Sequence, residues 1–296
     1  MKRRTWLVGV LTLVLALGAF GLAGCGSDSS GDTSSEGTSQ DGGSDLSGSL
    51  NVEGSDTMVN LSNSWAEQFM TENPSVNIAV KGGGSGNGIA ALINGTADFA
   101  NASREMKDEE IEQAKANNIN PIETAVALDG IAVVVNPANG VKGLTPDQLG
   151  KIYRGEITNW KDVGGADAAI VLLSRDSSSG TYEYFKEAVV GKEKNYAKAA
   201  KLLPSTQAIV DETKGNEAAI GYVGVGYVTP DVKVLEIDGV AASVATVLDN
   251  SYPISRKLYM YSNGDPSGAG KAFVDWILGA AGQKVVEDEG FVPLGN

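Results

Sequence analysis

The stretch AAIVLLSRDSSSGTYEYFKEAVV, residues 168–190, holds in one piece the unit that recurs along this chain. Residues 168–173 are apolar and have the length of a buried strand. A loop rich in hydroxyl side chains follows, and residues 181–190 have the pattern of a helix. Strands that alternate with helices predict an α/β fold with largely parallel sheets. Because ligands of such sheets bind beyond the carboxyl ends of the strands, we expect the loop at 174–181 to line a binding site.

The same alternation extends to both sides of this stretch. Residues 145–156, TPDQLGKIYRGE, predict a helix with Thr145 as its cap, proline at the first helical position and Gln148 completing a capping box. We also predict a helix at 195–203 and a single long helix at 268–290. At 123–137, two apolar runs are separated by Asp129 and Gly130.

The first residues of the chain have the features of an export signal. Three cations precede an apolar run that ends in small residues before Cys25, so we interpret residues 1–24 as a signal peptide. Cys25 is the only cysteine, which leaves no partner for an intramolecular disulfide. Cys25 is then either a site of lipid attachment or an incidental cysteine that follows an ordinary signal peptide.

Residues 25–49 are Ser, Gly, Thr, Asp, Glu and Gln with almost no large apolar side chain, a composition typical of a disordered linker. Residues 50–296 then remain for the folded part. The formal net charge of −14 becomes −17 when the three cations of residues 1–24 are removed. This acidity argues against a nucleic-acid partner and against electrostatic binding to a membrane.

Four loops share one design, in which a strand end is followed by hydroxyl or glycine residues and then by a helix start. These loops are residues 53–58, 82–88, 101–105 and 174–181. The first amides of a helix lack internal partners and carry partial positive charge, so each loop can hold an anion. A single loop of this kind would more simply be a turn with N-capping serines, but four in one chain favour an oxyanion site.

The sequence resembles the phosphate-binding lipoproteins of bacterial phosphate ABC transporters. The similarity is carried, in order, by GSDTM, GGGSGNGI, DFANASRE, LDGIAVVVN, GEITNW and SRDSSSGT, and it covers essentially all of residues 50–296. It implies a two-lobed periplasmic-binding-protein-like fold of type II, with two hinge crossings and a ligand cleft between the lobes. Lobe 1 would comprise about 50–128 and 254–296, and lobe 2 about 129–253. The motif LAGC, residues 22–25, resembles a lipobox and implies that Cys25 is lipidated, which would hold the protein at the outer face of a membrane.

The resemblance also implies which residues bind inorganic phosphate. The phosphate contacts of the family fall on Thr57, Ser85, Arg175, Ser179, Gly180 and Thr181. Ser55, Ser103 and Arg104 lie in the same loops and complete our candidate set. Arg175 would supply the fixed charge, because a guanidinium can bind two oxygens at once. Arg104 either adds a second cation or pairs with surface acids.

One feature of some relatives is missing. They place an aspartate after the third strand to accept the proton of the phosphate, whereas the matching segment here reads Ala102-Ser103-Arg104. Asp56 and Asp129 are the remaining candidate acceptors. The alternatives are that Asp56 only caps its helix and that Asp129 only serves the hinge turn.

Other functions fit the sequence less well. The chain has no histidine, and its one cysteine lies at the expected lipid site, so Ser-His or Cys-His catalysis and the usual zinc ligands are excluded. Residues 86–91 match a loose dinucleotide fingerprint without an acid for the ribose, and residues 264–272 lack two features of a P-loop. We therefore expect a monomeric receptor without cofactor or metal that delivers phosphate to the permease subunits of an ABC transporter. The alternatives are an exported phosphate-ester enzyme or surface adhesin on the same scaffold, and a receptor for another oxyanion.

Overall fold

The computed structural model of this chain describes residues 46–295. The predicted signal segment, Cys25 and most of the predicted linker lie outside the described residues. The first strand begins at Gly48 and not at residue 50, since Gly48 and Ser49 pair with Val76 and Asn77 of the next strand. Within residues 46–295, no helix is long and apolar enough to cross a membrane.

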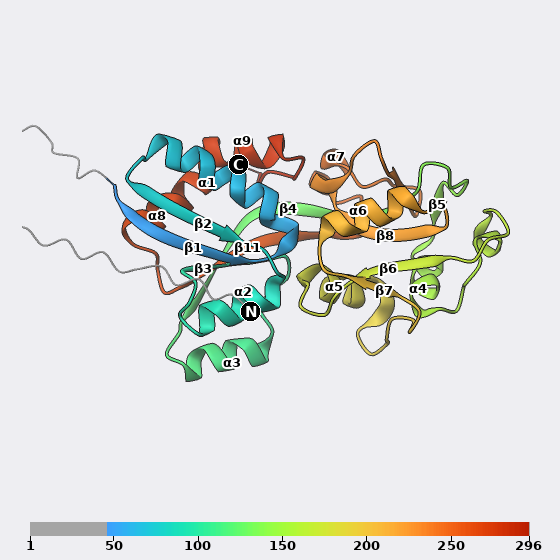
Figure 1. Ribbon diagram of the computed structural model, residues 1–296, viewed down its shortest axis with the longest axis horizontal. Coiled ribbons are helices and arrows are strands. Elements are labelled where there is room, and N and C mark those ends of the chain that lie inside the picture. Colours follow the sequence, from blue (N-terminus) through green and yellow to red (C-terminus); the bar gives the residue numbers. More distant parts are fainter. Residues whose placement is uncertain (1–45, 296) are drawn as a thin grey trace, which may run out of the picture. The chain divides into compact units, whose positions relative to one another are not determined.

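The described residues alternate between strands and helices along the chain (Figure 1). The strands are β1 (Gly48–Gly54), β2 (Val76–Lys81), β3 (Phe99–Ala102), β4 (Pro121–Val135), β5 (Gly143–Leu144), β6 (Val171–Arg175), β7 (Lys201–Leu203), β8 (Ala219–Gly224), β9 (Lys233–Val234), β10 (Glu236–Ile237) and β11 (Ser255–Asn263). The α-helices are α1 (Val59–Glu72), α2 (Ser85–Ile93), α3 (Asp108–Ala116), α4 (Pro146–Arg154), α5 (Gly180–Phe185), α6 (Thr206–Gly215), α7 (Val244–Leu248), α8 (Gly268–Leu278) and α9 (Ala280–Asp288). The other helical segments are η1 (Asp56–Met58), η2 (Trp160–Val163), η3 (Lys186–Gly191) and η4 (Val225–Tyr227).

The long strand β4 connects two halves of the sheet, whose order is β2-β1-β3-β11-β4-β8-β6-β7. Its residues up to Gly130 pair with β11, and its residues from Ile131 onward pair with β8. The chain returns beside this point, where the Ile131 amide donates to the Ile254 carbonyl over 2.8 Å and β11 begins at Ser255. The predicted two-lobed α/β fold with two crossings is therefore confirmed. We call the part around β1, β2 and β3 the first lobe and the part around β6, β7 and β8 the second lobe.

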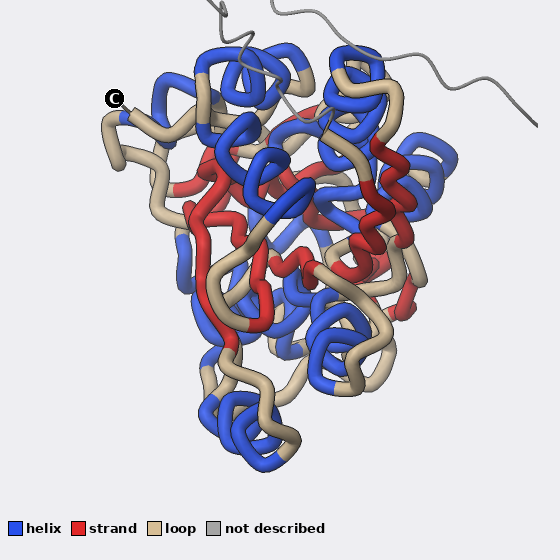
Figure 2. Tube along the Cα trace, turned by 90° about the vertical axis from the view of Figure 1, so that its left-hand side faces the viewer, coloured by secondary structure: helices blue, strands red, loops and turns tan. Residues whose placement is uncertain are grey.

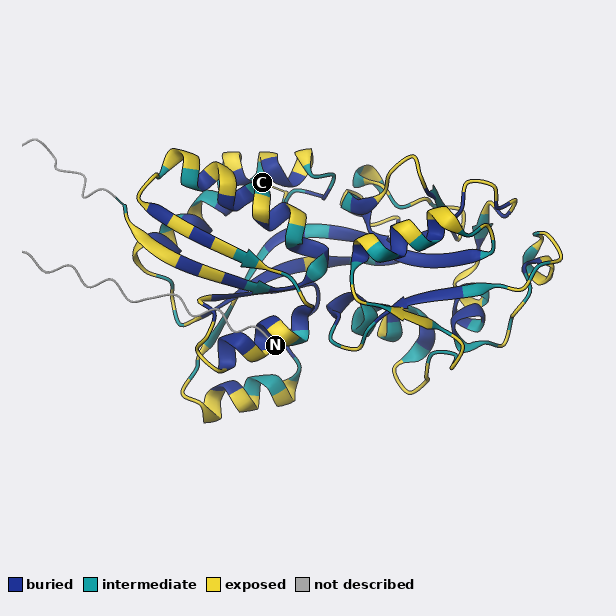
Figure 3. Ribbon diagram, in the orientation of Figure 1, coloured by how far each residue is buried: buried dark blue, intermediate teal, exposed yellow. Residues whose placement is uncertain are grey.

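In the first lobe, helices cover both faces of the sheet. α1, α8 and α9 lie on one face, and α2 and α3 lie on the other (Figures 1 and 2). Successive side chains of a strand point to opposite faces, so Phe99 joins the apolar core that contains Trp65 and Phe273, while Ala100 joins the core that contains Ile89. Figure 3 shows that the central strands are buried, that β1 and β2 alternate between buried and exposed residues, and that the helices expose their outer faces.

In the second lobe, an aromatic cluster fixes the end of β6. Phe185 of α5 stacks on Tyr222 of β8 with ring centroids 4.0 Å apart, and Tyr153 of α4 packs edge-on against both rings. The Tyr222 hydroxyl contacts Ser174 Oγ at 2.7 Å and accepts a hydrogen bond from the Arg175 amide at 3.3 Å. The cluster therefore holds the start of the loop at 174–181.

The predicted start of α4 is confirmed in detail. The helix begins at Pro146, and Thr145 Oγ1 accepts a hydrogen bond from the Gln148 amide at 3.2 Å. Gln148 Oε1 accepts the Thr145 amide in return at 2.9 Å. Both halves of the capping box are thus formed.

Two helix predictions are wrong. Residues 195–203 form no helix. The ring of Tyr196 stacks on that of Tyr182, and the last three residues of the segment pair with β6 as the strand β7. The predicted long helix at 268–290 is two helices, α8 and α9. Gly279 between them has an extended backbone, and Trp65 Nε1 donates to the carbonyl of Gly282 at 2.9 Å, which holds the second helix against α1.

Candidate functional site

Four buried hydroxyl side chains meet where the two lobes face each other. We call Thr57, Ser85, Ser103 and Thr181 the hydroxyl cluster. Thr57 Oγ1 lies 2.7 Å from Thr181 Oγ1, and Ser103 Oγ lies 3.3 Å from Ser85 Oγ and 3.5 Å from Thr181 Oγ1. Three of these residues follow the parallel strands β1, β2 and β3, which end at one edge of the sheet. Thr181 comes from the second lobe, so the cluster joins both lobes.

The hydroxyl cluster has a hydrogen atom available to donate to a ligand. The Ser103 amide donates to Ser85 Oγ at 3.0 Å, and Nη2 of Arg256 donates to Thr181 Oγ1 at 3.0 Å. These two bonds use oxygen lone pairs and none of the hydroxyl hydrogens. Three contacts among four hydroxyl groups use at most three of the four hydrogens. At least one hydrogen is therefore left for a ligand that accepts, such as an oxyanion.

Gly180 allows the second-lobe loop to reach the cluster. A Cβ at this position would lie 2.2 Å from Ser85 Oγ and 2.7 Å from Ser103 Oγ, so any side chain would push the two lobes apart. Ser179 caps α5, and its Oγ accepts the Tyr182 amide at 3.3 Å, which leaves its hydrogen free to donate. The amides of Gly180 and Thr181 are the first of the helix and have no partner in a preceding turn.

A second contact between the lobes lies beside the cluster. The Gly86 amide donates to the Ser178 carbonyl at 3.0 Å, and Ser178 Oγ donates to the Gly83 carbonyl at 3.1 Å. A Cβ on Gly84 would lie 2.6 Å from the Ser178 carbonyl oxygen, and φ of Gly84 is +102°. Glycine is required there for both reasons.

Asp56 and Ser55 connect the first loop to its surroundings. The Ser55 amide donates to the Asn101 carbonyl at 2.8 Å, while the Ser55 side chain, although buried, caps no helix. Asp56 Oδ2 accepts the Thr206 amide at 2.6 Å, at the first residue of α6. Asp56 therefore caps a helix of the second lobe and not the helix that follows it in the chain.

Arg175 is buried, and its guanidinium faces the loop between β7 and α6. Its Nε and Nη2 donate to the carbonyls of Leu203 and Pro204 at 3.3 and 3.0 Å, and Nη1 donates to Thr206 Oγ1 at 2.7 Å. Nη2 also lies 3.4 Å from Asp56 Oδ2. Burial lowers the pKa of Arg175, and the neighbouring Asp56 opposes that shift. Among the described residues, no hydrogen bond joins Arg175 to the hydroxyl cluster.

Arg104 pairs with an acid of α3. Its Nη1 and Nη2 each donate to one carboxylate oxygen of Glu110 at 2.7 Å. The second alternative for Arg104, pairing with an acid, is thus formed, although the pair is largely buried. The Nε of Arg104 is buried and has no hydrogen-bond partner within the described chain, so it can still donate.

Asp129 forms a buried ion pair with Arg256, a residue that the sequence analysis missed. Asp129 Oδ2 accepts Nη2 and Nε of Arg256 at 2.8 and 3.0 Å, and Oδ1 accepts the Val225 amide at 3.0 Å. Burial raises the pKa of Asp129, and Arg256 opposes that shift. The two residues lie opposite each other in the pairing of β4 with β11. The sequence did contain one signal for this residue. Arg256 is a charged residue near the start of a predicted strand, at the point where the chain was expected to return from one lobe to the other.

Each arginine around the cluster has its own carboxylate. The pairs are Arg104 with Glu110, Arg175 with Asp56, and Arg256 with Asp129. The formal charges within each pair cancel, so these three pairs add no net positive charge beside the cluster. An anion would be held there mainly by local donors.

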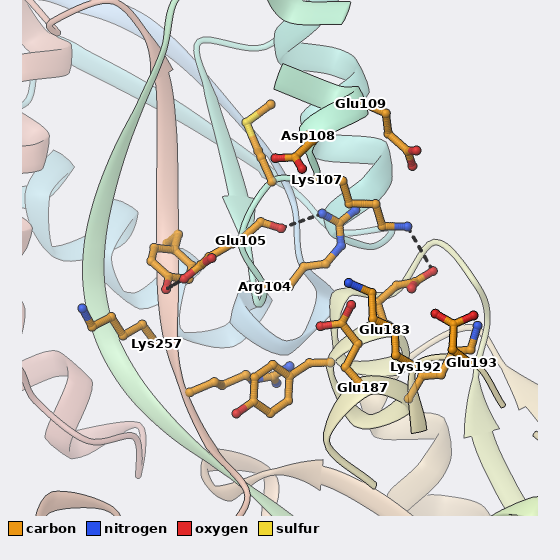
Figure 4. Close-up of a pocket in the computed structure, with 15 residues that line it drawn as sticks. Arg104, Glu105, Lys107, Asp108, Glu109, Glu183, Glu187, Lys192, Glu193 and Lys257 are labelled. Carbon is orange, nitrogen blue, oxygen red and sulfur yellow. Dashed lines mark hydrogen bonds and ion pairs between the residues drawn. The ribbon is translucent and has the colours of Figure 1, made fainter. Parts of the chain in front are cut away.

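A cleft of about 850 Å³ lies on the side of the cluster where Arg104 and Arg256 are found. Acidic and basic side chains from both lobes line it, as Figure 4 shows. Lys107, before α3, reaches across toward Glu183 of α5, with Nζ 3.3 Å from Oε1. The hydroxyl cluster itself is buried and does not line this cleft.

Comparisons with known proteins agree with this architecture. Residues 35–281 match the model of the PBP superfamily domain. The chain is 36% identical to the phosphate-binding protein PstS of Bacillus subtilis, over 96% of this chain and 94% of the relative. It is 33% identical to the phosphate-binding protein PstS of Pseudomonas aeruginosa, over 85% and 84%. The chain belongs to the PstS family.

Solved structures of this family show the same fold. A putative phosphate ABC transporter substrate-binding protein from Clostridium perfringens, solved with bound phosphate, is 36% identical and superposes with a TM-score of 0.79, covering 84% of this chain and all of the other. An ABC-type phosphate transport receptor from Vibrio cholerae is 29% identical with a TM-score of 0.69, over 83% of this chain and all of the other. The family and the fold predicted from the sequence motifs are thereby confirmed. The roles of the individual site residues stay predictions.

Proposed function

We propose that this PstS-family protein is an extracytoplasmic receptor that binds inorganic phosphate at the hydroxyl cluster and delivers it unchanged to an ABC transporter. The observation that carries the proposal is the cluster itself, in which buried hydroxyl groups of both lobes meet with hydrogens left to donate. Phosphate carries acceptor oxygens on every side, and neutral donors can bind it without a net positive charge. The PstS relatives and the phosphate-bound Clostridium structure support the choice of phosphate.

We propose phosphate contacts from both lobes. Ser55, Thr57, Ser85, Ser103 and Arg104 would act from the first lobe, and Arg175, Ser179, Gly180 and Thr181 from the second. In Arg104 the free Nε is the available donor. Arg175 uses at most four of its five N–H groups on the contacts described above, which leaves one for a ligand.

Closure of the lobes on phosphate follows from this arrangement. Only when the lobes meet do donors from both sides reach one anion, so phosphate favours the closed form. The hinge would lie where β4 changes its partner, which supports lobes of about 50–128 with 254–296, and of about 129–253. We propose that the receptor is monomeric, is anchored through lipidated Cys25 and hands phosphate to the permease subunits.

We propose that one of two aspartates, Asp56 or Asp129, accepts the proton of the phosphate. Asp129 already accepts three hydrogen bonds, from Arg256 and Val225. Asp56 has one oxygen, Oδ2, engaged with Thr206. We favour Asp56 for this reason. A bound sulfate has no proton to share, so a buried acceptor would repel it.

Equilibrium binding of labelled phosphate tests the function. We expect saturable binding that arsenate, another oxyanion of similar shape, competes for, with weak competition by sulfate and phosphate esters and with no ester turnover. Gly180→Ala should raise the Kd by about 100-fold or more, since its Cβ displaces the hydroxyl groups of the cluster. Gly215→Ala is the matched control, because a Cβ there meets nothing within 4 Å. Ester turnover would support the enzyme alternative, and equal competition by sulfate would support a general oxyanion receptor.

A further inference from the structure

Arg256 lies at the junction of the two lobes and has partners on every side. It lies in β11 opposite Asp129 of β4. Asp129 is followed by Gly130, the last residue of β4 that pairs with β11, and then by Ile131, the first that pairs with β8. Its Nη1 donates to the Ser103 carbonyl of the first lobe at 2.8 Å, and its Nη2 donates to Thr181 Oγ1 of the second lobe at 3.0 Å. The side chain is about 98% buried.

The surroundings of Arg256 fix its orientation. Asp129 accepts both Nε and Nη2, so the planar guanidinium cannot rotate without losing one of these bonds. The ring of Tyr184 lies over the guanidinium, with its centroid 5.6 Å from Cζ. The Tyr184 hydroxyl is itself held by a hydrogen bond to the Ser255 carbonyl.

This fixed guanidinium determines how the Thr181 hydroxyl can be used. A guanidinium has only donors, so Thr181 Oγ1 must accept from Arg256. The single hydrogen of that hydroxyl is then not used by Arg256 and is available to donate to the cluster or to a ligand. Arg175, by contrast, donates to carbonyls of the loop between β7 and α6 and has no such contact with the cluster.

We propose that Arg256, held in place by Asp129, is a positioning residue that fixes the Thr181 hydroxyl as a donor to bound phosphate. This inference rests on the proposed phosphate-binding function. It gives Arg256, which lies outside the motifs that carry the family resemblance, an influence on phosphate affinity that acts through Thr181. It also gives the buried Asp129 the task of orienting a cation, in place of accepting the proton of phosphate.

A double-mutant cycle on phosphate affinity tests the inference. Arg256→Lys keeps the charge but cannot reach Asp129, Ser103 and Thr181 at once, and we expect the Kd for inorganic phosphate to rise about tenfold. In the Thr181→Val background, where no hydroxyl is left to orient, the same change should raise the Kd by less than about twofold. Arg154→Lys, remote from the site and paired with the exposed Glu156, is the control and should leave the Kd within about twofold of the wild type.

A second cycle covers the case in which Thr181→Val leaves too little binding to measure. Asp129→Asn frees the guanidinium, so it should raise the Kd about as much as Arg256→Lys does, and the double variant should be no worse than either alone. Should Arg256→Lys fail to fold, the neutral pair Asp129→Asn with Arg256→Gln replaces it, with the same expected loss.

The results separate this inference from the proposed function. If the wild type binds phosphate while Arg256→Lys, or the neutral pair that replaces it, binds equally well, the function stands and the role of Arg256 is refuted. An equal loss from Arg256→Lys with and without the Thr181 hydroxyl, or additive losses in the second cycle, would also refute it, because a merely structural role predicts additivity. If the wild type itself binds no phosphate, the proposed function fails first.

Discussion

Two buried arginines near the site, Arg175 and Arg256, differ in the groups to which they donate hydrogen bonds. Arg175 lies within the motif SRDSSSGT and makes its hydrogen bonds to the loop at 203–206, with Asp56 nearby. Arg256 lies in a strand without any motif and donates to the hydroxyl cluster through Thr181, with Asp129 as its partner. Both pairs bring together parts of the chain that are more than 100 residues apart.

The two pairs also differ in exposure. The Asp129 side chain is fully buried, while that of Asp56 is 18% exposed. A carboxylate that can reach water tolerates the loss of its cation, whereas a fully buried one does not. Arg175, although it lies in a motif, therefore makes its side-chain hydrogen bonds to the loop that supports the site, whereas Arg256, outside any motif, contacts a hydroxyl group of the cluster.

Removal of Arg256 should have the largest effect on folding. Arg256→Ala leaves Asp129 buried without its cation, so we expect the free energy of unfolding to fall by about 3–5 kcal/mol. Urea denaturation without phosphate measures it. Lys161→Ala is the control and should cost about 1 kcal/mol or less, because both side chains of the Lys161–Asp167 pair are exposed. Equal losses in the two variants would contradict the importance of the buried pair.

Removal of Arg175 should cost less. Arg175→Ala leaves the Leu203 and Pro204 carbonyls and the Thr206 hydroxyl without this donor, and we expect a loss of about 1–3 kcal/mol. The same urea series measures it. Phosphate binding should weaken too, because Arg175 is one of the proposed phosphate contacts. An unchanged free energy of unfolding together with lost binding would show that Arg175 acts purely as a phosphate ligand.

The smallest expected effect on stability concerns Asp56. Asp56→Asn keeps an oxygen that can accept the Thr206 amide and loses only the charge near Arg175, so the free energy of unfolding should change by less than about 1 kcal/mol. Selectivity is the informative readout. If Asp56 accepts the phosphate proton, sulfate should compete more strongly with phosphate in this variant, and the same change at Asp129 should not have this effect. The reverse pattern would assign the acceptor to Asp129.

Much of the fold could be predicted from local patterns. The capping box at Thr145 and the strand-loop-helix unit at 168–190 depend on neighbouring residues. The box formed as expected, and the unit formed with a shorter strand, β6, and with a helix that is α-helical only in α5 and continues as η3. The helix predicted at 195–203 failed because stacking on Tyr182 and pairing with β6 outweighed local propensity. The break at Gly279 precedes a helix that is held by a contact of Gly282 with Trp65, which is 217 residues away in the chain.

The residues of the site also fall into those that local sequence patterns predict and those that depend on contacts between distant segments. The convergence of Thr57, Ser85 and Ser103 follows from parallel strands that end at one edge, so the pattern of loops predicted it. The partners of Arg175 and the position of Arg256 depend on contacts between distant segments, which no local pattern encodes. The pairing of Arg256 with Asp129 spans 127 residues and requires the register of β4 with β11.

A structure of this protein with bound phosphate tests the central claim most directly. We predict phosphate oxygens within hydrogen-bond distance of the hydroxyl groups of Thr57, Ser85 and Thr181, with Arg256 still donating to Thr181. Phosphate bound instead in the charged cleft between Lys107 and Glu183, with no phosphate oxygen in contact with the hydroxyl cluster, would contradict the account.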